Sequence, residues 1–420
     1  MPCSSEEDKS FFSNSSLLER IGKGEGRLHH CGLTKYETAY IDFTGIPCQF
    51  TGETTMHMSD ALLSPAVGIT FWAGTLGTIA YCSKKMKENL DEKMIPLMGV
   101  TGAFIFAAQM VNFTIPGTGS SGHLGGGMIL AIILGPYAAF IVMASVLTIQ
   151  ALFFADGGLL ALGSNIWNLG IYPCFIGYPL IYKPIVQKGM SSKKILVASL
   201  LSVFVGLQLG AFSVVLETLL SGRSELPLGT FVLLMQPIHL AIGVVEGFIT
   251  AGVINFVKAS RPELLENIGE TKALFPEIKV KKIVLAFLVI AIITGGIVSW
   301  FASSNPDGLE WSIERVYGKP ELPEHETGLA ALLKTIQEKT AFLPDYTFKK
   351  EETPKEQETL GKKVMGSTKG QKTPGSDANA WPNVEAGTSV SGILGSIMMF
   401  SLVFLIGFSI KAFRKRGMKK

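Results

Sequence analysis

The chain has 420 residues, of which 47% are hydrophobic and 17% are charged, with a formal net charge of +3. Soluble domains usually carry about 25% charged residues. Here the charges gather in short blocks between long apolar stretches, a pattern that fits a protein of the bilayer better than a large soluble core. So small a net charge indicates no nucleic-acid partner, and five cysteines without a CxxC pair predict no disulfide framework.

Long apolar segments begin at Leu62, after a polar and irregular stretch over residues 1–55. A membrane-spanning helix needs about 20 apolar residues. We therefore expect an all-α membrane protein, a polytopic helical bundle. Its predicted spans cover about residues 63–82, 95–115, 124–135, 137–155, 158–182, 195–220, 229–256, 282–302 and 391–411.

Four basic blocks decide the number of spans. Their members are Lys84, Lys85, Lys87, Lys93, Lys183, Lys188, Lys193, Lys194, Lys258, Arg261, Lys281, Lys282 and the lysines and arginines of residues 411–420. Basic loops stay in the cytoplasm, and the four blocks share one side only if segment 124–155, with its break at Gly135 and Pro136, crosses twice. We therefore predict nine spans, with a cytoplasmic C-terminus and the first span beginning outside.

The same pattern predicts two units. A unit of about seven spans covers residues 56–260, and a cytoplasmic linker covers 261–281. A second unit with two spans covers 282–412 and contains a polar outside loop, 303–390, rich in Lys, Glu, Gly and Pro. Residues 413–420 form a basic cytoplasmic tail.

Two histidines lie in polar clusters on the predicted outer face. His57 precedes the first span, and His123 follows the second. Imidazole suits nickel, cobalt, zinc and copper, although two ordinary loop histidines are the alternative. If the chain began at Met56, its free amine, the next backbone nitrogen and the His57 ring can form fused chelate rings, with His123 as a fourth nitrogen. Such planar nitrogen ligation is typical of Ni(II) or Cu(II). Because the peptide nitrogen must lose its proton to bind the metal, we expect uptake to weaken at acid pH.

Two pairs of amide side chains have the spacing of one helix face. Gln109 and Asn112 lie near the outer end of the second span, and Asn165 and Asn168 lie in the fifth. Each pair can orient His57 and His123. Hydrogen bonding between helices is the alternative.

Ionisable residues at membrane depth form another group of candidates. His239 and Glu246 lie seven residues apart in the seventh span. They suggest a second metal position or a conduction path, and for His239 we favour a structural polar contact. Asp156 and Glu217 are further acidic groups at or near membrane depth.

Catalytic signatures are missing from the sequence. No GxxxxGK[ST] motif occurs, so we expect no ATP hydrolysis by this chain. No HExxH motif supports a metal-dependent membrane protease, and no output domain supports a metal sensor. A channel or secondary transporter that works alone is the main alternative to a transporter driven by separate ATPases.

Five motifs occur in order over about residues 56–260: MHMSDALLSPAVG, FAAQMVNF, GTGSSGHLGGG, ALGSNIWNLGI and PIHLAIGVVEG. Together they resemble the nickel/cobalt permease family of energy-coupling-factor transporters. In that family the chain starts at the Met–His pair, and its amine, this histidine and a loop histidine bind the metal. The resemblance places these ligands on Met56, His57 and His123. It implies Ni(II) or Co(II) as the transported ion and no cofactor.

A sixth motif, PDGLE at residues 306–310, resembles the signature of the small accessory subunit of these transporters, which has two spans and is often fused to the permease. Its Asp307 and Glu310 can attract cations or cap a turn. The resemblance implies a membrane coupling subunit and cytoplasmic ATPase subunits as partners, in a prokaryotic plasma membrane. Residues 1–55 have no counterpart in the family, so we expect a start assigned too far upstream, or proteolytic removal.

Overall fold

The computed structural model describes residues 56–89, 94–187, 189–266, 281–323, 328–349, 382 and 384–417. They all lie in one compact body, Gly52–Lys420, which contains both of the predicted units. The predicted extension 1–55, most of the linker 261–281 and the 350–381 part of the loop lie outside the described residues.

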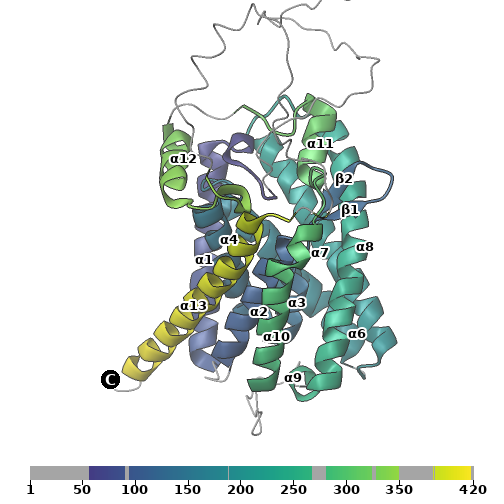
Figure 1. Cartoon of the computed structure of the whole chain (residues 1–420), viewed down its shortest axis with the longest axis vertical. Helices are drawn as coiled ribbons and strands as arrows, with labels where there is room; N and C mark the ends of the chain where they lie inside the picture. Colours follow the sequence, from purple (N-terminus) through teal and green to yellow (C-terminus); the bar gives the residue numbers. More distant parts are fainter. Residues whose placement is uncertain are drawn as a thin grey trace, which may run out of the picture. The chain divides into compact units, whose positions relative to one another are not determined.

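The first part of the chain forms a helical bundle (Figure 1). Its helices are α1 (Pro65–Asn89), α2 (Met94–Gln109), α3 (Gly127–Leu134), α4 (Pro136–Phe154), α5 (Leu162–Ile166), η2 (Trp167–Tyr182), α6 (Lys183–Val186), α7 (Ser192–Leu220), α8 (Leu228–Ser260) and α9 (Glu263–Glu266), with the short η1 (Asp60–Leu62) before α1. Helices α5, η2 and α6 run on without a break. The middle segment η2 is a π-helix that contains Pro173 and Pro179, and each proline lacks the N–H that a regular helix uses.

Helix α2 ends at Gln109, so the prediction that residues 95–115 form one span was wrong at its end. The chain then forms a hairpin in which β1 (Phe113–Ile115) pairs antiparallel with β2 (Ser120–Gly122). Gly117 and Gly119 have φ angles of 78° and 76°, which glycine adopts without the clash of a side chain. The hydrogen bonds between β1 and β2 pair backbone N–H and C=O groups that would pair within the helix if α2 continued.

The predicted span 124–135 is only partly helical. Helix α3 has 8 residues, which rise about 12 Å, whereas a hydrocarbon core is about 30 Å thick. Non-helical residues 123–126 lead into it, and Gly135, at φ 76°, separates it from α4.

The second unit adds α10 (Lys281–Gly296), η3 (Val298–Phe301), α11 (Gly308–Tyr317), α12 (Gly328–Thr340), η4 (Pro344–Tyr346) and α13 (Ala386–Gly417). Helix α13 packs along α2 and α10. Gly392 meets the backbone of Gly295, and Gly395 meets the ring of Phe106, so closely that neither has room for a side chain. Small residues allow such close approach of membrane helices.

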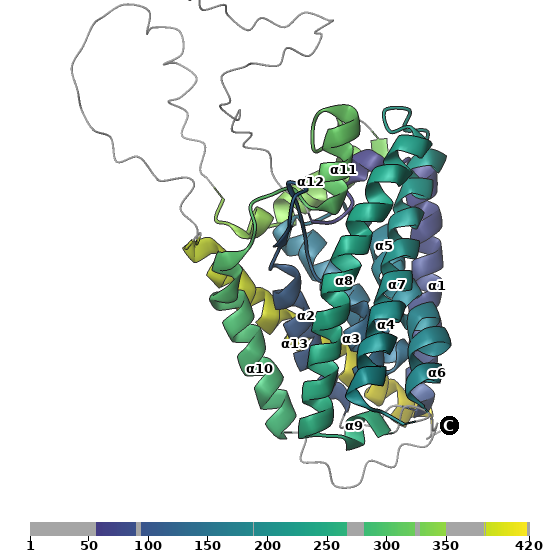
Figure 2. The ribbon, with the colours of Figure 1, turned by 90° about the vertical axis from the view of Figure 1, so that its right-hand side faces the viewer.

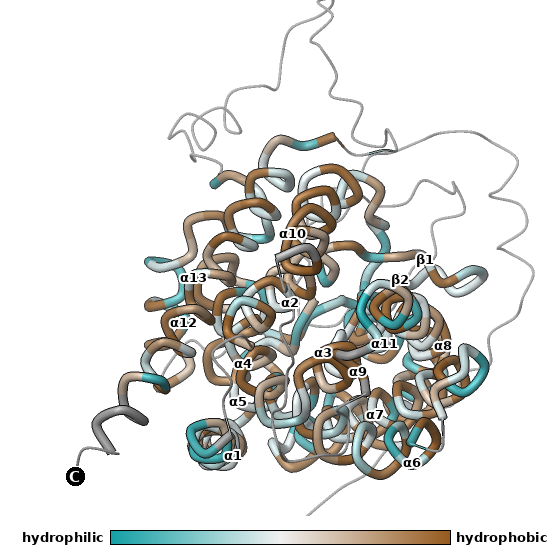
Figure 3. Tube along the Cα trace, turned by 90° about the horizontal axis from the view of Figure 1, so that it is seen from below, coloured by the Kyte–Doolittle hydropathy of each residue, from teal (hydrophilic) through white to brown (hydrophobic). Residues whose placement is uncertain are grey.

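Large apolar side chains cover the outside of the bundle. Leu220, Leu233 and Leu405 are 71%, 72% and 63% exposed, and Figure 3 shows the hydrophobic residues on the outer helices. Five helices in the described residues are long and apolar enough to cross a membrane: Pro136–Phe154, Leu162–Val186, Ser192–Leu220, Leu228–Ser260 and Ala386–Ala412. The chain is therefore an all-α, multi-pass membrane protein, as predicted, and the number of nine spans stays a prediction.

The helix ends sort into two groups. Helices α6 and α9 and the end of α13 lie at one end of the bundle, and α11, α12 and the hairpin lie at the other (Figures 1 and 2). Lys183, Lys258 and Lys411 belong to the first group of ends. This arrangement agrees with basic blocks that share one side of the membrane.

Candidate functional site

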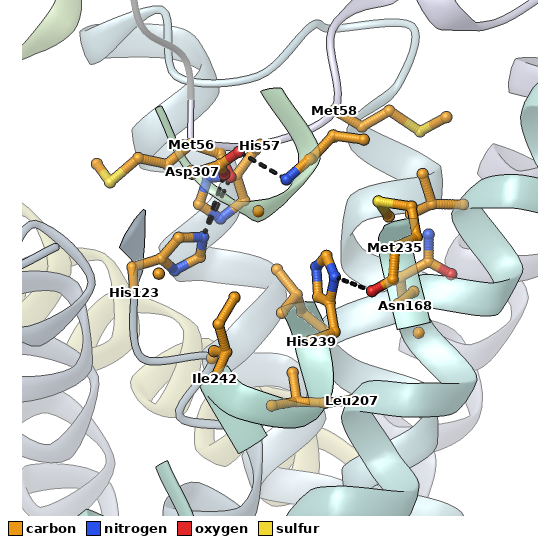
Figure 4. Close-up of a pocket in the computed structure, with 18 of the residues that line it drawn as sticks. Met56, His57, Met58, His123, Asn168, Leu207, Met235, His239, Ile242 and Asp307 are labelled. Atoms are coloured by element: carbon orange, nitrogen blue, oxygen red, sulfur yellow. Dashed lines mark hydrogen bonds and ion pairs between the residues drawn. The ribbon is translucent and has the colours of Figure 1, made fainter. Parts of the chain in front are cut away.

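A cavity of about 90 Å³ opens between the bundle and the start of α11 (Figure 4). A volume of this size holds several water molecules, or one ion with part of its hydration shell. The polar residues and glycines that line it include His57, Gly122, His123, Asn165, Asn168, His239 and Asp307, and the apolar ones include Met56, Leu207, Met235 and Ile242.

His57 lies just before η1 and is 4% exposed. Its Nδ1 lies 3.1 Å from Oδ1 of Asp156, and the backbone N–H of Met56 donates to the same oxygen at 2.9 Å. Asp156 follows α4, and its Oδ2 accepts a hydrogen bond from the hydroxyl of Tyr346 in η4. The other ring nitrogen of His57, Nε2, is buried and has no hydrogen-bond partner among the described residues.

His123 follows β2 and meets His57 in the cavity. The two rings are stacked, with centroids 5.3 Å apart and planes at 28°. His123 Nε2 lies 3.1 Å from the carbonyl oxygen of Met56 and 4.0 Å from Oδ2 of Asp307. The structure thus brings Met56 and His57, which precede η1, together with His123 from the loop between β2 and α3.

Two side chains hold the loop that carries His123. The carboxylate of Glu246, in α8, accepts the backbone N–H groups of Gly125 and Gly126, both at 2.9 Å. Gln109 donates to the carbonyl of Gly125 at 3.0 Å. Both residues were predicted as site residues, and both contact the loop rather than the histidine rings.

Asn165 holds the backbone next to His57. Its Oδ1 accepts from Met58 N at 3.2 Å, and its Nδ2 donates to Met58 O at 3.1 Å. Asn168 lines the cavity, and its amide contacts the carboxylate of Glu217 in α7.

The remaining predicted residues lie farther from the two rings. Asn112 lies beyond the end of α2, so it does not share a helix face with Gln109 as predicted, because the chain turns there toward the hairpin. His239 lines the cavity, and its Nδ1 donates to the carbonyl of Met235, one turn earlier in α8, at 2.8 Å. This contact agrees with the structural interpretation that the sequence favoured.

The pKa values of the two histidines shift in opposite directions. Burial works to lower the pKa of His57, but the charge and hydrogen bond of Asp156, with the charge of Asp307, outweigh it and raise this pKa. Burial, and then the nearby charge of His57, lower the pKa of His123 to about 4. Burial raises the pKa of Asp156, yet its contacts with His57 and Tyr346 reverse the shift and leave it lowered. Burial raises the pKa of Asp307 to about 7.

Sequence reasoning did not find all of the site. Asp156 stood out only as an acidic group near membrane depth, and nothing near Tyr346 marked it. Asp307 had a signal in the PDGLE motif, and its capping role is confirmed in α11. Among the described residues, no three His, Cys, Asp or Glu side chains are arranged to hold a metal ion by themselves. A site here therefore needs backbone nitrogen or oxygen as well.

Two family models match the chain. One, described as a cobalt uptake substrate-specific transmembrane region, matches residues 57–264, and a PDGLE domain matches residues 281–412. A putative metal transport protein of Haloquadratum walsbyi is 37% identical over 226 residues, covering 53% of this chain and 100% of that protein.

Fused relatives and a solved structure are similar as well. A putative fused nickel transport protein of Archaeoglobus fulgidus is 37% identical, covering 50% of this chain and 68% of that protein. A fused nickel transport protein of Rhodobacter capsulatus is 31% identical, covering 50% of this chain and 64% of that protein. A truncated transition metal transporter of known structure is 32% identical, with a TM-score of 0.44, covering 49% of this chain and 99% of that one.

Proposed function

This chain belongs to the family of cobalt uptake substrate-specific transmembrane proteins, here joined to a PDGLE domain, and from this we propose that it captures nickel or cobalt ions for an importer of the energy-coupling-factor type. The ion is the substrate, bound at the end of the bundle that faces outward. Separate ATPase subunits, acting through a membrane coupling subunit, drive the change of access.

One observation carries the proposal. His57 and His123 lie on different loops, yet their rings stack at 5.3 Å beside the cavity. Neutral imidazole is a good ligand for Ni(II) and Co(II). His123 stays neutral down to acid pH because its pKa is lowered to about 4, so it remains available to a cation.

The remaining ligands follow from the chemistry of the Met56–His57 pair. An α-amine on Met56, the backbone nitrogen of His57 and its Nδ1 can form two fused chelate rings around one ion. Met56 N and His57 Nδ1 already face one point, since both contact Asp156 Oδ1, at 2.9 and 3.1 Å. We therefore infer that the metal-binding form of the protein begins at Met56, and the family match that starts at residue 57 supports this. Planar nitrogen ligation favours nickel over cobalt.

Metal titration of the purified protein tests the proposal. We expect one Ni²⁺ or Co²⁺ per chain. His57→Ala or His123→Ala should weaken binding by about 100-fold or more, because mutating residues that only orient metal ligands already lowers metal affinity by about 10–100-fold. His239→Ala is the matched control. It removes a histidine from the same cavity whose Nδ1 is already bonded within α8, and it should change the affinity less than about threefold. Equal binding by all three variants would contradict the proposed site.

A further inference from the structure

The second unit reaches the cavity through the first residues of α11. Asp307 is the N-cap of this helix, and its Oδ1 accepts from Leu309 N at 2.9 Å and Glu310 N at 2.8 Å. Glu310 completes a capping box by accepting from Asp307 N at 3.2 Å. The second oxygen, Oδ2, takes no part in the cap and lies 4.0 Å from His123 Nε2. Asp307 therefore contributes one oxygen to its helix and directs the other toward the cavity.

The hairpin of the first unit holds this segment in place. Ser121 in β2 donates its N–H to Pro306 O at 2.8 Å and its hydroxyl to Asn305 O at 2.8 Å. Trp311 of α11 donates back to Thr118 O at 3.0 Å. Because Ser121 lies two residues before His123, the same hairpin fixes the positions of the histidine and of the residues that precede Asp307.

Glycine at position 308 allows the close approach. A Cβ added to Gly308 would lie 3.2 Å from Cε1 of His239 and 3.0 Å from Cδ1 of Ile242. Contacts this short are tighter than side chains normally make, so a larger residue would push α11 away from α8. The adjacent Asp307, which is 4% exposed, is thereby kept at the cavity wall.

Charge balance gives this carboxylate a role. A divalent cation in a buried site costs much free energy unless opposite charge lies close by. His57 and His123 bind as neutral ligands, and Asp156 supplies one negative charge beside His57. Asp307 is the second carboxylate that lines the cavity or contacts its histidines in the described residues. Both carboxylates lower the free-energy cost of placing a cation in this buried cavity.

Distance is compatible with direct coordination. Nitrogen and oxygen ligands lie about 2.0–2.2 Å from a first-row divalent ion such as zinc. Two ligands on one such ion are then about 3 Å apart when adjacent and about 4 Å apart when opposite. The separation of 4.0 Å between His123 Nε2 and Asp307 Oδ2 is about 1 Å more than that of adjacent ligands. A small shift of the Asp307 carboxylate would place it beside His123 on the ion.

We propose that the carboxylate of Asp307 joins the two histidines in holding the divalent cation, so that the accessory unit supplies part of the metal site. This inference rests on the proposed function. It gives the PDGLE segment two tasks: the aspartate caps α11 and faces the ion, and the glycine lets the helix approach. Metal binding and docking of the accessory unit then favour each other.

Asp307→Asn in the full chain tests the inference. Asparagine caps helices about as well as aspartate, so the variant removes the negative charge and keeps α11. In a Ni²⁺ or Co²⁺ titration of the purified protein we expect about a tenfold or greater loss of affinity. The matched control is Glu314→Gln, which removes a charge from the exposed side of the same helix and should leave the affinity unchanged. Asp307→Ser, which also caps, replaces Asp307→Asn if that variant fails to fold.

Three arms separate the inference from the proposed function. If His123→Ala loses the metal while Asp307→Asn binds as tightly as Glu314→Gln, Asp307 has only a capping role and the inference is wrong. If His123→Ala binds like the wild type, the proposed site itself fails. Loss of affinity in His123→Ala and Asp307→Asn, with Glu314→Gln unchanged, supports both. The visible d–d spectrum of bound Co²⁺ gives an independent readout, because loss of an oxygen ligand changes it.

Discussion

Asp156 connects the two units at the level of single residues. One of its oxygens accepts from Met56 and His57 of the first unit, and the other accepts from Tyr346 of the second. These contacts orient the His57 ring, and the charge raises its pKa. Carboxylates that orient a ligating histidine in this way strengthen metal binding.

Asp156→Asn should therefore weaken Ni²⁺ binding by about 10–100-fold. It should also lower the pKa of His57, since the raising effect of the Asp156 charge is lost while the lowering effect of burial remains. Titration of the His57 ring by NMR measures the second effect directly. A variant with weaker binding and an unchanged His57 pKa would show that Asp156 acts on something other than this histidine.

The pKa shifts predict the pH dependence of metal binding. Because the pKa of His57 is raised above the usual histidine value of 6.5, protons compete with the metal for this ring at pH values near and above 6.5. His123, with a pKa of about 4, adds no competition there. Protonation of Asp307, whose pKa is about 7, acts in the same direction. Affinity should thus fall on acidification, by about tenfold per pH unit for each proton displaced. Equal dissociation constants at pH 8 and pH 5.5 would contradict this account.

At the level of elements, the loop between β2 and α3 is positioned by a neighbouring helix. Glu246 holds two successive N–H groups of this loop, just before α3, whose 8 residues are too few to cross the membrane. Apolar content suggested a span at 124–135, because hydropathy cannot distinguish a short buried helix from part of a crossing. The hairpin also escaped prediction, since its strands have three residues each.

Glu246→Gln should loosen that loop, because glutamine has one carbonyl oxygen and can accept at full strength from only one of the two N–H groups. We expect about tenfold weaker metal binding, with no change in the number of ions bound. Asn255→Ala is the control on α8, since this side chain bonds only to Ala251 of its own helix among the contacts described. If Glu246→Gln binds as tightly as Asn255→Ala, the loop does not depend on this carboxylate.

Across the whole molecule, hydropathy and charge gave the class of fold, because lipid-facing helices must be long and apolar. The convergence of His57 and His123 followed from placing both loops on one face. The positions of Tyr346 and Asp307 could not be predicted, because they depend on how the second unit docks on the first. That docking uses backbone contacts such as Ser121 with Pro306, which leave no pattern in the sequence.

A transporter driven by partner ATPases should not work alone. Cells that express this chain without a coupling subunit and ATPases should take up no more ⁶³Ni²⁺ than cells with an empty vector. Uptake should rise when those subunits are co-expressed and fall again with His123→Ala. Uptake by the chain alone, abolished by His123→Ala, would instead favour a channel or secondary transporter.

The central claim is a metal site built on Met56, His57 and His123, and one measurement on the protein purified from its membrane tests it most directly. Intact mass and N-terminal sequence are determined on the same sample as the bound metal. We predict a chain that begins at Met56 and carries one nickel or cobalt ion. A chain that keeps Met1 and still holds the ion would contradict the amine ligand, and would direct attention to His123, His239 and Glu246 instead.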